Sequence, residues 1–375
     1  MSSWKSYKLG DIAEITSSKR IFYSEYVPSG IPFWRSKEII EKFNRKNIST
    51  DLFISNEKYQ EIKSKFGVPQ QNDILLTSVG TLGIPYLVQS DEQFYFKDGN
   101  LTWIKNINNE LLNPLFLFKW LASSIGRESL SEITIGSTQE ALTISGLKTL
   151  ELLLPPLEEQ KAIAEVLSSL DDKIDLLHRQ NQTLESLAQT LFRQWFIEEA
   201  KEEWEVRTFG DLVEVSSGKS LKRELFDDMG KYEVLGANGK IGKTNEWLFE
   251  EELIYTGRVG TLGNIFLIDE AKKVWLSDNT LVVKPKKYFY FIYFLMIDFQ
   301  LENLNVGSTQ PLVRQSDLKN IEISLPNDEI VLIFEQQSKD IFKKINQNKK
   351  QIQTLENLRD TLLPKLLSGE IKIKD

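Results

Sequence analysis

The chain contains two copies of one sequence pattern, and this repeat limits the possible folds more than any other feature. The copies begin alike, as Trp4, Leu9, Gly10, Asp11, Ile12 and Glu14 match Trp204, Phe209, Gly210, Asp211, Leu212 and Glu214. Residues 79–83 return as 259–263, and residues 136–139 return as 307–310. The offset therefore falls from 200 (Trp4 to Trp204) to 180 (Val79 to Val259) and 171 (Gly136 to Gly307). We expect two related halves, the second shorter in its middle.

Composition bounds the class of protein. The 375 residues suffice for two or three domains, and a hydrophobic content of 41% suffices for sizeable cores. Since the sequence has no cysteine, we expect no disulfide and a cytoplasmic location. We find no apolar run of signal-peptide or membrane-span type and expect no membrane contact. The net charge of −8 argues against a simple nucleic-acid binder, but it leaves room for a basic cleft in a protein whose acidic residues gather elsewhere.

Two segments have the spacing of a coiled-coil seam, with apolar residues alternately four and three positions apart. The seams run from Ile163 to Trp195 and from Phe334 to Leu366. Helices of about 40 residues would be roughly 60 Å long, and we expect them to pack antiparallel through a pseudo-twofold relation between the halves. Placing Asn181 opposite Asn348 sets all other seam positions opposite one another and satisfies both amides. The alternative is that both asparagines lie in a solvated layer.

Each predicted helix follows a region of short strands, turns and a few short helices, so we expect α+β domains. Strands are predicted at 73–77, 94–96, 101–104, 253–256 and 280–283. Asn113 before Pro114 predicts the start of a short helix, and residues 290–297 occupy the corresponding place. Prolines that stop a strand and acidic residues that start a helix mark a boundary within residues 154–160. The predicted organisation is a domain at 1–155, a helix at 156–199, a second domain at 200–326 and a second helix at 327–375.

No catalytic constellation is evident in the sequence. The single histidine, His178, follows a seam position and is expected on the helix flank, and one histidine without cysteine cannot build a zinc site. The glycine-rich stretches match neither common phosphate-binding pattern, so no cofactor is expected in this chain. A methyltransferase acting alone would need an aromatic residue after its Pro-Pro pair, and here Leu157 follows. The sequence predicts a scaffold and reader; the rival classes are an enzyme acting alone and a protein-only coiled-coil adaptor.

The repeated turns are candidates for contact with DNA. Turns with small hydroxyl and amide residues expose N–H and O–H groups that can hold phosphate, and glutamine can contact an adenine edge. The alternative is that their glycines simply make tight turns between strands. The candidates are Thr77, Ser78, Thr81, Ser137, Thr138 and Gln139 in the first copy, and Thr261, Ser308, Thr309 and Gln310 in the second.

Positive and aromatic residues gather where the two copies differ. They are Lys19, Arg20, Phe22, Tyr23, Trp34 and Arg35 in the first copy, and Lys219, Lys222, Arg223 and Arg258 in the second. Arginine commonly contacts guanine, and lysine mostly contacts phosphate, although ordinary surface charge explains any one of these residues equally well. Different side chains on a repeated backbone structure are suited to two domains that recognise different short DNA sequences.

Several segments resemble type I restriction-modification specificity subunits. Residues 154–164, which read LPPLEEQKAIA, and the following residues 170–174 resemble the central conserved region of that family. The opening at Trp4, the two GSTQ segments and the ending at residues 362–371 are similar to the family too. The resemblance covers the whole chain. It implies two target recognition domains held apart by an antiparallel pair of conserved helices, each domain contacting one half of a bipartite, asymmetric site in double-stranded DNA.

The resemblance also implies partners. The chain would catalyse nothing, and its helices would act as a ruler between the half-sites. It would position two modification subunits, which carry S-adenosylmethionine and methylate adenine, and recruit restriction subunits that use ATP and Mg. Helix surfaces at 158–195 and 329–366 would dock the modification subunits. Since Val331 takes the place of Gln160, the resemblance does not carry equivalent docking to the second helix start. A solitary methylation system without a nuclease is a further possibility.

Overall fold

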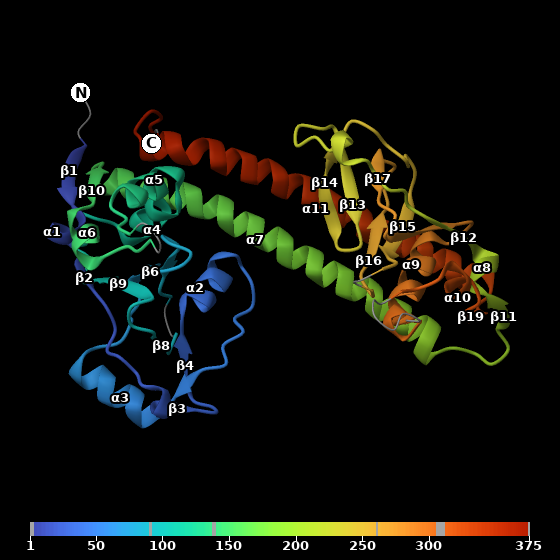
Figure 1. Ribbon diagram of the computed structural model, residues 1–375, viewed down its shortest axis with the longest axis horizontal. Helices are drawn as coiled ribbons and strands as arrows, with labels where there is room; N and C mark the ends of the chain where they lie inside the picture. Colours follow the sequence, from blue (N-terminus) through green and yellow to red (C-terminus); the bar gives the residue numbers. More distant parts are fainter. Residues whose placement is uncertain (1–3, 90–91, 137–139, 260–261, 305–311, 374–375) are drawn as a thin grey trace. The chain divides into compact units, whose positions relative to one another are not determined.

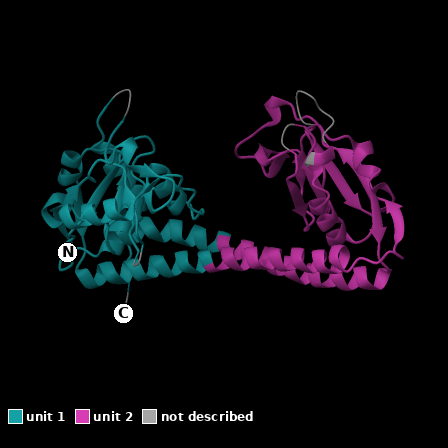
Figure 2. Cartoon of the chain, turned by 90° about the horizontal axis from the view of Figure 1, so that it is seen from below, with its two compact units in different colours: residues 1–175, 353–375 teal, residues 176–352 magenta. Residues whose placement is uncertain are grey.

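The computed structural model describes residues 4–89, 92–136, 140–259, 262–304 and 312–373 (Figure 1). The chain divides into two compact units (Figure 2): residues 1–175 with 353–375 form the first, and residues 176–352 form the second. Each unit contains one mixed α+β domain together with parts of two long helices. Within the described ranges, no helix has the length and apolar character needed to cross a membrane.

The domain of the first unit contains three groups of strands. Strands β1 (Lys5–Lys8) and β10 (Glu151–Leu154) form an antiparallel pair. An antiparallel sheet has the order β2 (Glu14–Thr16), β9 (Leu101–Lys105), β6 (Ile74–Thr77), β7 (Pro85–Leu87). A further sheet has the order β3 (Tyr26–Val27), β5 (Phe53–Ile54), β4 (Ile31–Trp34), β8 (Tyr95–Phe96), with β4 and β8 parallel. The helices are α1 (Leu9–Ile12), α2 (Ser36–Phe43), α3 (Asn56–Lys65), α4 (Pro114–Ala122), α5 (Ser124–Glu132), α6 (Ile144–Thr149) and the 3-10 turn η1 (Tyr23–Glu25).

The domain of the second unit has the same plan. Strands β11 (Glu205–Thr208) and β19 (Glu322–Leu325) form its antiparallel pair. One sheet has the order β12 (Val213–Ser217), β18 (Thr280–Pro285), β15 (Leu253–Gly257), β16 (Ile265–Ile268), and another β14 (Gly239–Thr244), β13 (Tyr232–Gly236), β17 (Val274–Leu276), with β13 and β17 parallel. The helices are α8 (Phe209–Leu212), α9 (Phe289–Asp298), α10 (Gln315–Lys319) and the 3-10 turns η3 (Arg223–Leu225) and η4 (Leu301–Leu304).

The matching strand orders confirm the two related α+β halves, including the predicted strands and short helices. In the first domain, α2, β5 and α3 lie between β4 and β6, whereas β14 alone connects β13 to β15 in the second. The second copy is therefore shorter in its middle, as the falling offset predicts. The Asn113 side chain accepts the N–H of Phe116 at 3.0 Å and so caps α4, as expected from its position before Pro114.

Both long helices contribute to the core of each domain. In the first unit, Ile163 of α7 (Leu157–Arg193) and Leu366 of α11 (Asp328–Leu367) pack in one cluster with the β2-β9-β6 sheet and α4. In the second unit, a π-helical turn (Gln194–Glu198) follows α7, and its Phe196 lies 5.1 Å, between ring centroids, from Phe334 of α11. The three boundaries between the four predicted segments stay a prediction, since each compact unit contains parts of both helices.

The two helices pack antiparallel in the predicted register. In the second unit, the Asn348 amide donates to the Asn181 side-chain oxygen at 2.8 Å, and the Trp195 ring lies 6.3 Å from Phe334. Both asparagines are buried, so they form a polar layer inside the seam and not a solvated end. His178 is exposed on the helix flank, as predicted.

A second polar contact within the helix pair joins an acidic residue to Arg359 of α11. In the first unit, Asp171 of α7 lies 3.0 Å from Arg359 of α11, 2.6 Å from Lys119 of α4 and 3.1 Å from Arg45. Burial opposes ionisation of Asp171, but Lys119 and Arg359 outweigh it and hold the pKa of this carboxyl below its usual value. The charged cluster therefore joins the helix pair to the first domain.

Gln160 at the start of α7 is buried and makes its contacts inside the first unit. Its oxygen accepts the N–H of Asn113 at 2.9 Å, and its amide donates to the carbonyls of Leu111 at 2.8 Å and Pro155 at 2.9 Å. Gln160 thus ties the start of α4 to α7. Its replacement by Val331 in the second copy therefore changes a buried contact within the unit and not the outer surface of the helix.

Glu335 makes the corresponding contact in the second unit, one helical turn after Val331. Its carboxylate accepts the N–H of Phe291 at 2.6 Å, at the start of α9. Burial raises the pKa of Glu335, and the N–H groups of Phe291, Tyr290 and Phe289 partly offset that effect. The two halves therefore connect the same two helices by different residues at different positions.

Candidate nucleic-acid interface

In the first unit, β6 leads into the repeated residues 79–83. The N–H of Ser78 donates to the carbonyl of Asn100 at 2.8 Å, and the carbonyl of Ser78 accepts the N–H of Leu142 at 3.0 Å. These two bonds place the end of β6 beside the chain that follows residues 136–139. Both repeated segments therefore adjoin one small region of the domain.

The second unit repeats both bonds. The N–H of Arg258 donates to the carbonyl of Asn279 at 2.8 Å, and the carbonyl of Arg258 accepts the N–H of Val313 at 3.0 Å. The backbone frame is the one found around Ser78, while the side chain changes from a small hydroxyl to a guanidinium. The same backbone frame therefore carries different side-chain chemistry in the two halves.

Some predicted DNA contacts lie outside the described residues. They are Ser137, Thr138 and Gln139 in the first copy, and Thr261, Ser308, Thr309 and Gln310 in the second. Thr81 is described and exposed. Contact between these residues and DNA stays a prediction.

Thr77 and Ser78 require a correction. Thr77 is fully buried, and its hydroxyl accepts the N–H of Ile84 at 2.9 Å. Ser78 is 4% exposed, and its hydroxyl lies 2.6 Å from that of Thr102 and donates to the carbonyl of Leu76 at 3.1 Å. The prediction that these two side chains contact DNA is wrong for this structure, because both hydroxyls hold the end of β6 in place.

Lys19 and Arg20 remain at the surface of the first unit. The N–H of Lys19 donates to the hydroxyl oxygen of Tyr95 at 2.6 Å, which fixes the backbone, and its ammonium lies 5.3 Å from the Phe66 ring centroid. Arg20 pairs with Asp98 at 2.8 Å, but its side chain is 68% exposed. Exposed ion pairs contribute little energy, so both cations can contact DNA without destabilising the fold. Their role in binding stays a prediction.

Arg35 also requires a correction. Its guanidinium lies 2.8 Å from Glu38 and 2.6 Å from Asp51, and its N–H donates to Glu38 at 2.7 Å. The Glu38 carboxylate is completely buried, and its hydrogen bond raises the pKa of Arg35 against the opposing effect of burial. Arg35 therefore closes the start of α2. The prediction that it contacts DNA bases is not supported by this arrangement.

The predicted cations of the second unit are accessible. Lys219, Lys222 and Arg223 are exposed. The carbonyl of Lys219 accepts the indole N–H of Trp275 at 2.7 Å, and the Lys222 side chain, 79% exposed, lies 3.8 Å from Glu224. These residues present positive charge on an anchored backbone.

Arg258 is the predicted residue with the most developed surroundings. One of its guanidinium nitrogens lies 3.4 Å from the Ser217 hydroxyl, which also accepts a hydrogen bond from Gln315 at 2.9 Å. Among the described residues, its buried Nε finds no hydrogen-bond partner. A guanidinium that contacts one anchored hydroxyl and keeps other N–H donors can bind guanine or phosphate oxygens.

The sequence interpretation missed Ser217 and Gln315. Gln315 stands where the first copy has Ile144, at the offset of 171 that relates Gly136 to Gly307. A polar residue in place of an apolar one was therefore an available signal. Its contact with Ser217 joins α10 to β12, which are far apart in the sequence, and the sequence alone does not reveal that contact.

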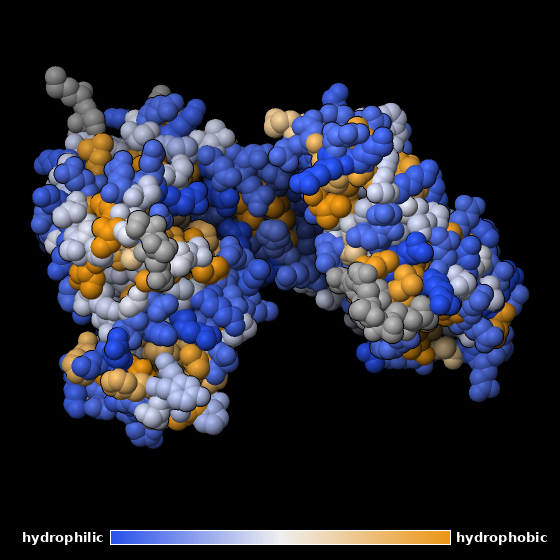
Figure 3. All heavy atoms as spheres, viewed as in Figure 1, coloured by the Kyte–Doolittle hydropathy of each residue, from blue (hydrophilic) through white to orange (hydrophobic). Residues whose placement is uncertain are grey.

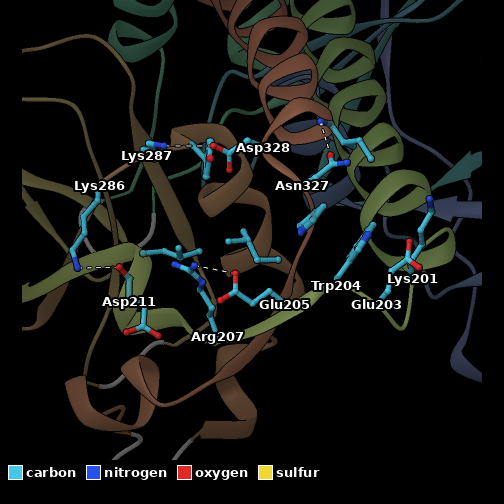
Figure 4. A pocket seen from close by; sticks show the side chains of 15 residues that line it. Lys201, Glu203, Trp204, Glu205, Arg207, Asp211, Lys286, Lys287, Asn327 and Asp328 are labelled. Carbon is cyan, nitrogen blue, oxygen red and sulfur yellow. Dashed lines mark hydrogen bonds and ion pairs between the residues drawn. The ribbon is translucent and has the colours of Figure 1, made fainter.

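A different polar cavity lies in the second unit, where the β11–β19 pair meets the start of α11 (Figure 4). Its volume is about 660 Å³. Arg207 pairs with Glu205 at 2.9 Å and Lys287 with Asp328 at 3.6 Å, so neighbouring carboxylates balance these cations. The mixed charge makes the cavity a poor match for a polyanion. Within the described part of the chain, no cluster of histidine, cysteine, aspartate or glutamate could hold a metal ion.

Comparison with known proteins places this architecture in a family. The model of the type I restriction modification DNA specificity domain matches residues 1–186 and 201–359. The MjaIX specificity subunit of Methanocaldococcus jannaschii is 28% identical, over 99% of this chain and 94% of that one. The HindI specificity subunit of Haemophilus influenzae is 23% identical, over 99% of this chain and all of that one.

Solved structures agree on the fold. The crystal structure of the type I restriction-modification S subunit of M. genitalium matches 97% of this chain and 96% of its own, with a TM-score of 0.64 and 20% identity. The two α+β domains and their long helices are thus the architecture of that protein also. From the match of the family model to both halves, the chain belongs to the type I restriction modification DNA specificity domain family.

Proposed function

We propose that this chain is the DNA sequence-specificity subunit of a type I restriction-modification complex and that each half contacts one part of a bipartite, asymmetric DNA site. The observation that supports this proposal most directly is the comparison of Ser78 with Arg258, which occupy the same position in the two halves. Identical backbone bonds hold the two residues in their domains, but one side chain is buried and the other is an oriented guanidinium. Two halves with one frame and different chemistry suit two different half-sites.

In this proposal, Arg258 contacts a base in the half-site bound by the second domain. Arginine binds the O6 and N7 atoms of guanine through two parallel hydrogen bonds, and such a contact discriminates against the wrong base by about 1–3 kcal/mol. Ser217, whose hydroxyl is itself bonded by Gln315, restricts the Arg258 side chain before DNA arrives, which lowers the entropic cost of binding. The buried Ser78 cannot make this contact, so the half-site of the first domain is read by other residues.

We also propose that two modification subunits dock on the long helices. Leu187 of α7 is 47% exposed, and Leu358 of α11 is 43% exposed. Each lies within the sequence Thr-Leu-Glu-x-Leu, at residues 183–187 and 354–358. A single exposed leucine is common on protein surfaces, and it is the recurrence at the same place in both helices that supports docking. Because the same leucine occurs in both helices, the two surfaces fit two copies of one partner.

The chemistry in this proposal takes place in the partners. S-adenosylmethionine belongs to the modification subunits, ATP and Mg to the restriction subunits, and this chain acts without catalysis of its own. Membership of the specificity family supports the assignment. Action on chromosomal DNA implies work in the cytoplasm.

The proposal is tested by selection from random DNA duplexes with the purified complex of this chain and its modification subunit. We expect the bound duplexes to share two short specified blocks around a gap of fixed length. An assembled complex that selects no sequence would contradict the proposal and favour a protein-only adaptor.

A further inference from the structure

One segment in each unit has the same construction, begins with an exposed lysine and carries different side chains on its turn. We call residues 19–25 and 219–225 the display segments. The first is anchored where the N–H of Lys19 donates to the Tyr95 hydroxyl at 2.6 Å, and the second where the Trp275 indole donates to the carbonyl of Lys219 at 2.7 Å. Tyr95 and Trp275 lie on β8 and β17, the strands that pair in parallel within their sheets.

The far ends of the display segments match as well. In the first, the N–H of Glu25 donates to the carbonyl of Phe22 at 2.9 Å, which closes η1. In the second, the N–H of Leu225 donates to the carbonyl of Lys222 at 2.9 Å, which closes η3. Each display segment therefore begins with an anchored lysine and ends in one 3-10 turn, so its backbone is held at both ends.

The side chains on these turns differ completely. Phe22 is 62% exposed and Tyr23 is 90% exposed, whereas Lys222 and Arg223 occupy the equivalent positions of the second unit. Figure 3 shows hydrophobic atoms at the surface over the end of the first unit where β3 and α3 lie. In the free protein, the apolar surface of exposed aromatic side chains remains in contact with water. Covering that surface with a ligand yields the favourable free energy of apolar burial.

The second display segment adjoins the site of Arg258. Ser217, two residues before the anchored Lys219, accepts hydrogen bonds from Arg258 and from Gln315. Arg258, Lys219, Lys222 and Arg223 thus belong to one continuous part of the second domain. Its cations are complementary to phosphate groups, which fits the DNA ligand of the proposed function.

Resting on the proposed function, we infer that the display segments are paired DNA-contact elements whose turns differ in chemistry, aromatic in the first and cationic in the second. Phe22 and Tyr23 cover apolar groups of the first half-site, such as thymine methyls, and contribute sequence preference. Lys222 and Arg223 contact phosphates of the second half-site and contribute affinity that depends on salt and little on sequence. The shared Lys19 and Lys219 supply one phosphate contact each.

The inference is tested on the assembled modification complex by measuring binding to cognate and unrelated duplexes over a range of salt concentrations. K222A/R223A should weaken binding to both duplexes and reduce the slope of log K against log salt by about 1 to 2. F22A/Y23A should weaken cognate binding by about tenfold, leave unrelated DNA unaffected and leave the salt slope unchanged.

Matched variants control for charge and for lost apolar area. K5A/K8A removes two exposed cations from β1, and Leu153→Ala removes an exposed leucine from β10; both should behave as the unmodified chain does. Melting temperatures check that each variant folds. The inference would be overturned if both display-segment variants bound DNA normally, or if both lost the same amount of salt slope. The proposed function would still hold in that case, provided that the unmodified complex selects a sequence. Absence of selection by the unmodified complex would overturn both.

Discussion

The side-chain amide of Asn348 donates a hydrogen bond to the side-chain oxygen of Asn181 across the helix seam of the second unit, at 2.8 Å. Asn348 also donates to Gln180 at 2.9 Å, and both asparagines are buried. A buried amide is stable only when its partner lies opposite, so this layer disfavours any slipped pairing of α7 and α11. The polar pair sets the register that apolar residues alone leave loosely defined.

Replacing one asparagine should cost more than replacing both. Asn348→Leu leaves the Asn181 amide buried without its partner, and we expect a loss of about 1–3 kcal/mol in the free energy of unfolding. The double variant N181L/N348L removes both amides and should recover most of that loss. Urea unfolding measures the difference. Gln182→Leu, at an exposed position of the same helix, is the matched control and should change little.

Glu335 predicts how stability depends on the acceptor and on pH at the junction between α9 and α11. Glu335→Ala removes the acceptor for the N–H groups at the start of α9 and should destabilise the protein by about 1–3 kcal/mol, whereas Glu335→Gln keeps an acceptor and should cost less. Burial raises the pKa of Glu335, so ionisation is less favourable in the folded state. The stability of the unmodified protein relative to Glu335→Gln should therefore fall as pH rises through the titration range. Glu329→Ala, at an exposed position, should show neither effect.

Asp171 predicts the opposite dependence on pH. Its lowered pKa means that the folded state favours the ionised carboxylate, whose contribution is full above the ordinary value of about 4 and is lost as pH falls through the folded value. Asp171→Asn should destabilise the protein by about 2–3 kcal/mol at pH 7 and by progressively less under acid conditions. Denaturant unfolding over a pH series tests this. A constant difference across the series would contradict the ion-pair assignment, and the exposed neighbour Asp172→Asn is the control.

The repeated exposed leucines predict the number of bound modification subunits. Leu187→Glu and Leu358→Glu should each remove one docked subunit, and the double variant should remove both, because a charge would have to be buried at each contact. Native mass spectrometry of the mixed subunits measures the composition. Full occupancy of the double variant would exclude these surfaces, and Gln182→Glu on α7 should leave docking unchanged.

The sequence predicted most of the framework because its signals are local or repeated. Periodicity predicted α7 and α11, and the need of a buried amide for a partner predicted the pairing of Asn181 with Asn348. The cap at Asn113 likewise depends on neighbours in the chain. Such features require no knowledge of distant contacts, so they can be inferred before the fold is known.

The candidate site was harder to predict because exposure depends on distant contacts. Thr77 belongs to a residue type that commonly contacts phosphate, but the fold buries its hydroxyl against the N–H of Ile84. Arg35 likewise resembles a DNA-binding residue until Glu38 and Asp51 are placed beside it. Residue type indicates possible chemistry, whereas long-range packing decides whether a ligand can reach it.

The most direct test is adenine-methylation mapping of DNA from cells that express this chain with its modification subunit, with Arg258→Ala run in parallel. We predict a split motif of two specified blocks around a fixed gap, and we expect Arg258→Ala to relax one position in one block only. Absence of any motif, despite an assembled complex that holds S-adenosylmethionine, would contradict the account. Relaxation of both blocks together would contradict the assignment of one half-site to each domain.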